Sequence, residues 1–255
     1  MGEVLYALDG HVATLTLNRP DQRNAVSPEL TAAMDAAVRR FEDDDEAWVA
    51  LLTGAGPNFC AGADLKALAA GRAAELSTEA GGFGGFVRYP RTKPVIAAVR
   101  GFALAGGTEL VLACDLVVAG TDAQFGLPEV TRGIVAAAGG LFRLPRVLPP
   151  SRAIELILTA DRLGAQEAAR WGLVNHLVEP HEVVDTARAL ADRICRNAPL
   201  AVRESLAIAR DALRMDDEQG WERSAAAMQR VRDSADAKEG VQAFVEKRPA
   251  QWSGE

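Results

Sequence analysis

Cysteine and histidine are both scarce in this chain of 255 residues, which has three of each. Cys60, Cys114 and Cys195 form no C-x-x-C pair, and an odd number of cysteines cannot all pair within one chain. We therefore expect neither a disulfide framework nor a zinc ribbon, and a reducing, cytoplasmic location fits best. The histidines belong to no Cys or His cluster, and transition-metal sites usually need about three or four nitrogen or sulfur ligands, so we expect no metal site.

The chain also lacks long apolar runs and an excess of positive charge. No stretch of about eighteen apolar residues occurs, and the opening residues lack the basic stretch and apolar core of a signal peptide, so we expect no membrane contact. Lys and Arg number 28 against 35 Asp and Glu, and the resulting net charge of −7 argues against a protein that wraps nucleic acid. A small anionic ligand is compatible with this charge because it needs only a few local cations.

Strand patterns dominate the first half of the sequence. The dipeptide Asp9-Gly10 favours a tight hairpin turn between two strands, and Ser27-Pro28 is typical of a helix start that runs to about Phe41. A turn at Ala105-Gly106-Gly107 leads into a short apolar helix that ends near Cys114. Strand patterns cover residues 4–8, 12–17, 48–53, 93–99 and 115–119.

Helical patterns dominate the second half. They cover residues 151–159, 165–171, 181–196, 199–213, 218–232 and 236–246, with one strand-like stretch at 173–178. Because no Pro, Ser or Gly-rich linker intervenes, we predict one continuous α/β domain with a helical C-terminal extension. The charged residues of these last helices form a solvated face in one interpretation, and in the other their apolar stripes pack against another subunit.

Three glycine turns follow strand patterns, at residues 54–56, 61–64 and 105–107. None completes a dinucleotide fingerprint, and the chain has no phosphate-loop motif and no G-x-S-x-G motif, which argues against hydride transfer, phosphate-loop chemistry and an α/β-hydrolase nucleophile. The turn at 105–107 leaves free N–H groups at a helix N-terminus, which suit an oxyanion, an enolate or a carboxylate. The alternative is a turn that only needs glycine's backbone freedom.

Two glutamates lie in apolar surroundings near turns. Glu109 is flanked by leucine and valine one turn into the short helix, and Glu129 stands in the sequence GLPEV. Apolar surroundings raise the pKa of a carboxyl group toward the range useful for proton transfer. The two glutamates are therefore candidates for a general acid and a general base. A surface ion pair is the alternative for each.

Five segments in order resemble the enoyl-CoA hydratase/isomerase (crotonase) family. The resemblance implies an α/β fold in which a spiral of ββα units builds two roughly perpendicular sheets over residues 1–195. It also implies a helical region over residues 196–255 that builds a homotrimer, often paired into a homohexamer. The segments are LNRPDQRNAVS at 17–27, GAGPNFCAGADLK at 54–66, KPVIAAVRGFALAGGTELVLACDLVVAG at 93–120, AQFGLPEVTRGI at 123–134 and FVEKRP at 244–249.

The resemblance implies an acyl-CoA thioester as substrate and no separate cofactor. On matching positions, the N–H groups of Ala63 and Gly106 hold the thioester oxygen, Glu129 exchanges a proton with the α-carbon, and Glu109 orients and deprotonates the attacking water. Family isomerases commonly lack an acid at the first glutamate position, so Glu109 favours an enoyl-CoA hydratase. The alternatives are an isomerase, a specialised acyl-CoA dehydratase and a non-catalytic acyl-CoA-binding protein.

The resemblance also implies contacts to the rest of the substrate. Arg23 matches a position near the CoA phosphates, while Lys247 with Phe244 matches a tail position that reaches a neighbouring subunit's CoA. Each of these residues is also compatible with an ordinary surface role. Further binding positions implied by the resemblance are Ala25, Ala61, Asp64, Leu65 and Gly107.

One stretch departs from the family pattern. Family hydratases commonly read I-P-G-A-G-G after the second glutamate, whereas this chain reads VAAAGG at 135–140. The lost proline and first glycine fall where a backbone group helps to place the catalytic water, although Ala137 can still donate its N–H. Leu141 and Phe142 replace a more polar pair, which favours an acyl pocket for a bulkier or more apolar chain.

Overall fold

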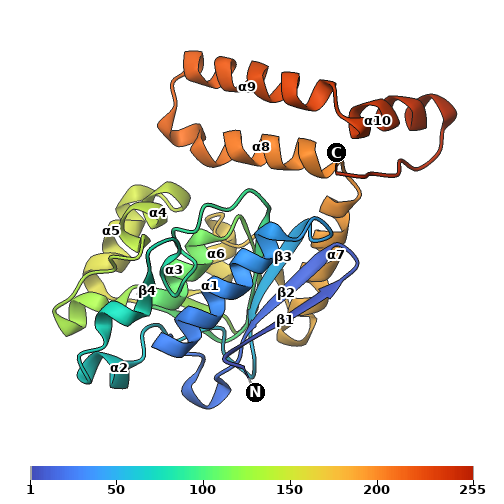
Figure 1. Ribbon diagram of the computed structural model, residues 1–255. Helices are drawn as coiled ribbons and strands as arrows, with labels where there is room; N and C mark the ends of the chain where they lie inside the picture. The colour runs from blue at the N-terminus through green and yellow to red at the C-terminus, as the bar shows by residue number, and fades with distance from the viewer. Residues whose placement is uncertain (1, 255) are drawn as a thin grey trace.

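A six-stranded sheet forms the centre of the computed structural model, which describes residues 2–254 (Figure 1). The strand order is β1-β2-β3-β6-β8-β11, in which β1 and β2 form an antiparallel hairpin and all other neighbours are parallel. The strands are β1 (Val4–Asp9), β2 (Val12–Leu17), β3 (Val49–Gly54), β6 (Val95–Val99), β8 (Leu116–Gly120) and β11 (His176–Val178).

Helices cover both faces of this sheet. Strands β3 and β6 are buried along their whole length, as expected for apolar parallel strands with helices on both sides. Helix α7 (Val183–Cys195) packs against β3, β6 and β8 through Val183, Ala187 and Ala191. On the other face lies α1 (Pro28–Asp43), whose N-terminus is capped by the Ser27 hydroxyl as the sequence predicts.

Smaller elements surround the opposite end of the core. A three-stranded sheet has the order β10-β9-β7, and β4 pairs with β5. These short strands are β4 (Ser77–Thr78), β5 (Gly82–Phe83), β7 (Phe102–Leu104), β9 (Gln124–Gly126) and β10 (Leu163–Gly164). The helices here are α2 (Leu65–Ala69), α3 (Gly106–Ala113), α4 (Gly140–Val147), α5 (Pro150–Thr159) and α6 (Ala165–Arg170). Single 3₁₀ turns lie at Pro20–Gln22, Ala73–Leu76, Pro128–Arg132, Pro180–Glu182 and Ala212–Arg214.

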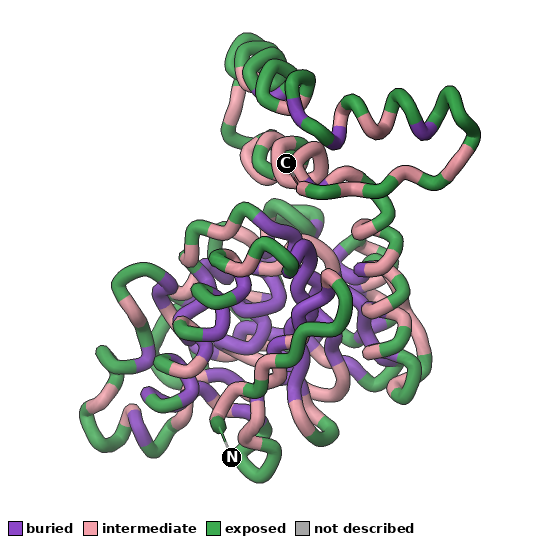
Figure 2. The backbone as a smooth tube through the Cα atoms, turned by 45° about the vertical axis from the view of Figure 1, so that its right-hand side comes forward, coloured by how far each residue is buried: buried purple, intermediate pink, exposed green. Residues whose placement is uncertain are grey.

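The last three helices stand beside the core (Figure 1). They are α8 (Pro199–Asp211), α9 (Asp217–Arg232) and α10 (Ala235–Glu246). Arg210 ties α8 to the core, because its guanidinium donates two hydrogen bonds of 2.7 Å to the Asp115 carboxylate. Most residues of α9 and α10 are exposed, in contrast with the buried core (Figure 2). Large apolar side chains exposed in this region are Leu213, Trp221, Met228, Val241, Phe244 and Val245.

The sequence predicts the longer elements well and misses the short ones. The strand predicted at 173–178 is confirmed only at 176–178, and the helix predicted from 181 begins at Val183 after a 3₁₀ turn. Helix α4 was not predicted because Pro145 lies inside it and proline disfavours helix interiors. The predicted boundary after residue 195 falls between α7 and α8, and the functional division of the chain there stays a prediction. No helix within residues 2–254 is long and apolar enough to cross a membrane.

Candidate active site

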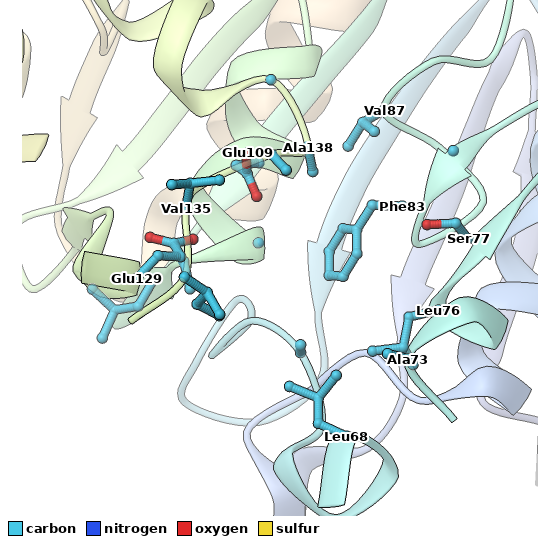
Figure 3. Close-up of a pocket in the computed structure, with 18 of the residues that line it drawn as sticks. Leu68, Ala73, Leu76, Ser77, Phe83, Val87, Glu109, Glu129, Val135 and Ala138 are labelled. Carbon is cyan, nitrogen blue, oxygen red and sulfur yellow. The ribbon is translucent and has the colours of Figure 1, made fainter. Parts of the chain in front are cut away.

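A cavity of about 520 Å³ lies at the N-terminus of α3. Figure 3 shows Glu109, Glu129 and Val135 along one wall, with Phe83, Leu76 and other side chains from the β4–β5 region facing them. Of the residues assigned from the sequence, seven line this cavity: Ala61, Ala63, Leu65, Gly106, Glu109, Glu129 and Ala137.

Two backbone turns meet at the floor of the cavity. Cys60 forms a bridge to the strand before α3, since its N–H donates to the Phe102 carbonyl at 2.9 Å and its carbonyl accepts from the Leu104 N–H at 3.0 Å. Gly62 has a φ of +94°, and a Cβ at this position would lie 2.8 Å from the Ala105 Cβ and 3.2 Å from the Gly106 nitrogen. The turns at 61–64 and 104–107 therefore touch, and only glycine fits at position 62.

Gly107 has a packing role rather than a place in the cavity lining. A Cβ on Gly107 would lie 2.2 Å from the Cys60 carbonyl oxygen, so the missing side chain allows the helix start to approach the neighbouring turn. Its predicted contact with substrate stays a prediction.

The N–H groups of Ala63 and Gly106 have no acceptor among residues 2–254, so both are free to bind a ligand. The bridge between Val26 and residues 62–64 uses the Gly62 carbonyl and the Asp64 N–H, which turns the Ala63 N–H away from that bridge. Gly106 is the first residue of α3, where an N–H has no acceptor within the helix. Because both residues line the cavity on touching turns, their N–H groups form a pair of donors suited to a single oxyanion.

Glu109 is buried at the top of α3, with 3% of its surface exposed. Its Oε1 accepts a hydrogen bond of 2.9 Å from the Gly140 N–H, at the start of α4. The pKa of Glu109 is raised to about 7, mainly by burial and also by the nearby Glu129, while the Gly140 N–H and the Arg143 cation oppose the shift. The sequence-based expectation of a raised pKa is therefore confirmed, and Glu109 changes its protonation state near neutral pH.

Glu129 is also buried, and it comes from the 3₁₀ turn at Pro128–Arg132. Its Oε2 is shielded from solvent and has no hydrogen-bond partner among the described residues. Burial raises the pKa of Glu129, and the Arg132 cation opposes this shift. The two carboxyl groups thus face one cavity from separate elements (Figure 3). Oε1 of Glu109 accepts from a backbone N–H, whereas Oε2 of Glu129 has no partner in the described part of the chain.

Arg143 joins the two walls of the cavity. Its Nη2 donates to the Val87 carbonyl at 2.7 Å, and its Nη1 donates to the Ala138 carbonyl at 3.4 Å. Its hydrogen bond to Ala138 stabilises the turn before α4, and the Gly140 N–H of this turn donates to Oε1 of Glu109. Sequence reasoning missed this residue, because α4 was not predicted and nothing else in the sequence places residue 143 beside Val87.

A second cavity of about 400 Å³ adjoins the first at Leu65. It is lined by Ala25, Asp64 and Leu65 together with Glu3, Arg19, Gln22 and Lys66. The Asp64 carboxylate accepts from the Lys66 N–H at 2.9 Å and from Arg19 at 3.0 Å, which holds its pKa below the usual range despite partial burial. Asp64 therefore has a definite structural role, as the N-cap of α2.

Three further predicted residues lie outside both cavities. Arg23 is exposed, with its guanidinium 5.9 Å from the centre of the Phe102 ring. Phe244, which is 85% exposed, lies near the end of α10, and Lys247 caps that helix. Within one chain these two residues lie apart from the cavities, so the contact predicted for them requires a second subunit.

The family model described as enoyl-CoA hydratase/isomerase matches residues 8–255. This chain belongs to the enoyl-CoA hydratase/isomerase family. The family assignment made from the five sequence segments is therefore confirmed.

Similar members of the family share the whole fold. A carnitinyl-CoA dehydratase of Proteus mirabilis (strain HI4320) is 43% identical over 251 residues, covering 96% of each chain. An enoyl-CoA hydratase structure from Mycobacterium tuberculosis H37Rv is 44% identical with a TM-score of 0.96, and a carnitinyl-CoA hydratase structure from Mycobacterium avium is 44% identical with a TM-score of 0.77. Both structures match over 100% of each chain, which confirms the predicted crotonase-type α/β fold with its C-terminal helices.

Proposed function

We propose that this family member is a hydratase that reversibly adds water across the 2,3 double bond of a 2-enoyl-CoA thioester. The observation that carries the proposal is one cavity that holds two free N–H donors and two buried carboxyl groups. The donors suit the thioester oxygen, and the carboxyl groups suit the two proton transfers that hydration requires.

In the proposed reaction, the N–H groups of Ala63 and Gly106 bind the thioester carbonyl oxygen. Glu109 removes a proton from water as the water oxygen forms a bond to the β-carbon. The electron pair of the double bond then passes through the α-carbon to the thioester oxygen, which becomes an enolate held by the two N–H groups. Glu129 donates its proton to the α-carbon as the enolate collapses, and the product is a 3-hydroxyacyl-CoA.

The environments of the two glutamates support this division of roles. The Gly140 N–H stabilises the ionised form of Glu109, which a base needs. Burial raises the pKa of Glu129, and among residues 2–254 no donor reaches its Oε2, which favours the protonated form that an acid needs. In the reverse direction, dehydration, the two roles exchange.

A specialised dehydratase is the second candidate, because several similar curated proteins are named carnitinyl-CoA dehydratases. Dehydration and hydration are two directions of one equilibrium, so this candidate uses the same groups in reverse. An isomerase needs a single base that moves a proton, and the second buried carboxyl group favours hydration over isomerisation.

The remaining parts of the proposal concern the CoA end and the assembly. The second cavity beside Leu65 would receive the CoA portion, and Arg23, which follows Gln22 of its lining in the chain, would contact a phosphate. Phe244 and Lys247 would serve the CoA of a neighbouring chain in a homotrimer or homohexamer, which agrees with the exposed apolar side chains of α9 and α10. The three free cysteines fit the proposed cytoplasmic location.

The test is loss of the ultraviolet absorbance of the conjugated thioester when the protein is added to 2-enoyl-CoA thioesters of several chain lengths. We expect Glu109→Gln and Glu129→Gln each to lower kcat by about 10²- to 10⁴-fold, because each removes a proton-transferring group. Glu46→Gln is the matched control, since Glu46 is exposed and lines neither cavity. Near-parental activity in both site variants would show that the roles are wrongly assigned.

A further inference from the structure

The substrate cavity has more cationic than anionic side chains in its wall. Arg88, Arg132 and Arg143 line it, and within the described residues the only acidic side chains of its lining are Glu109 and Glu129. Burial raises the pKa of both glutamates, that of Glu109 to about 7, so part of the Glu109 negative charge is absent at neutral pH. The cavity therefore presents a positive electrostatic environment to the acyl group.

Two of these arginines form no ion pair with a carboxylate among residues 2–254. The Arg88 guanidinium has no hydrogen-bond or ion-pair partner in this part of the chain. Arg132 is exposed, and its guanidinium donates to the Pro128 carbonyl at 3.4 Å and to the Thr131 hydroxyl at 3.3 Å, while its charge acts on the nearby Glu129 carboxyl without a direct ion pair. Their charges are consequently available to attract or repel a ligand in the cavity.

Among the described lining residues, the groups that could hold a quaternary ammonium are two aromatic rings, each in contact with another part of the chain, and the two glutamates that the proposed reaction uses. Such a cation is held by open aromatic faces or by carboxylates. Among the described lining residues the aromatic ones are Phe83 and Phe142. Guanidinium groups already lie over the Phe142 ring, Arg143 at 5.4 Å and Arg146 at 5.1 Å from its centre. The Phe83 ring packs against Gly106, where a Cβ would approach it to 2.4 Å.

Most of the remaining lining is apolar. It includes Leu68, Leu76, Val87, Leu104, Ile134 and Val135. A bulky apolar acyl group buries its surface against these side chains at no electrostatic cost. A cationic acyl group of the same shape has to approach Arg88, Arg132 and Arg143 in a partly enclosed site, where charge repulsion is stronger than in water.

We propose that the cavity selects acyl groups without positive charge and rejects those with a quaternary ammonium, and that Arg88 and Arg132 determine this specificity. The inference rests on the proposed function, because it assumes that the acyl group of a CoA thioester occupies the cavity. It distinguishes this chain from the relatives named carnitinyl-CoA dehydratases, since a carnitinyl group carries a quaternary ammonium.

Two substrates of nearly equal shape isolate the effect of charge. One is 4-(trimethylammonio)but-2-enoyl-CoA, and the other is 5,5-dimethylhex-2-enoyl-CoA, in which carbon replaces the charged nitrogen. We expect kcat/KM for the neutral substrate to exceed that for the cationic one by about 10-fold or more. Dissociation constants for both thioesters, measured by calorimetry with Glu109→Gln protein, are expected to differ in the same direction.

Charge-removing variants then test the two arginines. We expect the Arg88→Met/Arg132→Met protein to lower the neutral-to-cationic ratio, and the Arg88→Lys/Arg132→Lys protein to keep it. Arg170→Met/Arg193→Met is the matched control, because it removes two positive charges from exposed positions outside the cavity. This control is expected to leave the ratio unchanged.

Equal or better use of the cationic thioester by the parent protein would overturn the proposal. An unchanged ratio of kcat/KM for the neutral and the cationic thioester in the Arg88→Met/Arg132→Met protein would also overturn it. Equally weaker binding of both thioesters by this variant would overturn it too, because the arginines would then contact the CoA portion that both thioesters share. If neither thioester is hydrated, the proposed function fails, and the two dissociation constants still decide the charge preference.

Discussion

At the scale of single residues, Glu109 combines a buried carboxyl group with one backbone donor, the Gly140 N–H. A carboxylate followed by Leu110, Val111 and Leu112 in an apolar helix predicts burial and a raised pKa, and both are confirmed. The partner of its Oε1 could not be predicted, because Gly140 lies 31 residues away and its N–H is positioned by a helix that the sequence does not indicate. Local composition therefore identifies Glu109 as a buried carboxyl group, and only the tertiary structure identifies the groups that change its pKa.

The raised pKa of Glu109 has a consequence for stability. Its folded-state pKa of about 7 exceeds the ordinary value of 4.5 for a glutamate, so the folded state binds more protons between these values and stability falls as pH rises through them. Glu109→Gln keeps an acceptor for Gly140 and removes the buried charge. We expect the variant to gain on the order of 2 kcal/mol relative to the parent between pH 5 and pH 8.

Urea unfolding of both proteins at the two pH values measures this gain. A difference in unfolding free energy that does not change with pH would contradict the burial of an ionisable Glu109. Glu109→Gln is also expected to be nearly inactive, so the carboxyl group that catalysis needs lowers the stability of the folded protein.

Arg143 gives a second prediction at this scale. Its cation lowers the pKa of Glu109, and hydration needs Glu109 ionised, so kcat/KM is expected to rise with pH through about 7 in the parent. In Arg143→Met the loss of the cation raises the pKa of Glu109 and moves this rise to higher pH. A pH profile of kcat/KM measures the shift. Arg143→Lys keeps a positive charge at this position and is expected to return the profile part of the way to that of the parent. If the pH profile of Arg143→Met is the same as that of the parent, Arg143 does not influence the pKa of Glu109 and has only a structural role.

At the scale of elements, the geometry that matters is the contact between the turns at 61–64 and 104–107. The sequence indicates each turn by its glycines, and the family resemblance pairs Ala63 with Gly106. The contact itself depends on β7, which is only three residues long and carries too little pattern to be predicted. Short strands such as β7 and β9 form because neighbouring strands pair with them rather than through local propensity.

Gly62→Ala tests this contact. The added Cβ would meet Ala105 at 2.8 Å and the Leu104 carbonyl at 3.0 Å, so the turns must separate and the two N–H donors move apart. We expect kcat to fall by about 10²-fold or more, the cost of losing one oxyanion donor. Gly172→Ala is a matched control, because Gly172 has a similar φ of +88° and open space around it. Equal activity loss in both variants would show that backbone strain, and not the contact between the turns, causes the effect.

At the scale of the whole molecule, the C-terminal helices expose large apolar side chains that the rest of the chain does not cover. Helical periodicity predicts α8, α9 and α10 correctly, since these elements are long and locally encoded. What covers Trp221 and Phe244, which are 77% and 85% exposed, lies outside a single chain and cannot be read from one sequence. Exposed apolar side chains gathered on one region are typical of an interaction surface.

We expect the purified protein to elute with the mass of a homotrimer or homohexamer when measured by size-exclusion chromatography with light scattering. Trp221→Glu and Phe244→Glu each place a charge on the apolar surface and are expected to shift the mass toward the monomer. Leu5→Glu, on the half-exposed β1, is the control that should leave the mass unchanged. A parent protein that stays monomeric at micromolar concentration would contradict the proposed assembly.

The central claim is that the paired N–H donors and the paired glutamates add water to an enoyl thioester. Mass spectrometry of the acyl-CoA after incubation in ¹⁸O-labelled water tests it most directly. The account predicts that the product gains the mass of one labelled water molecule, and that Glu109→Gln and Glu129→Gln protein produce little of it. A product of unchanged mass with a moved double bond, or no product from any 2-enoyl-CoA in the panel, would contradict it.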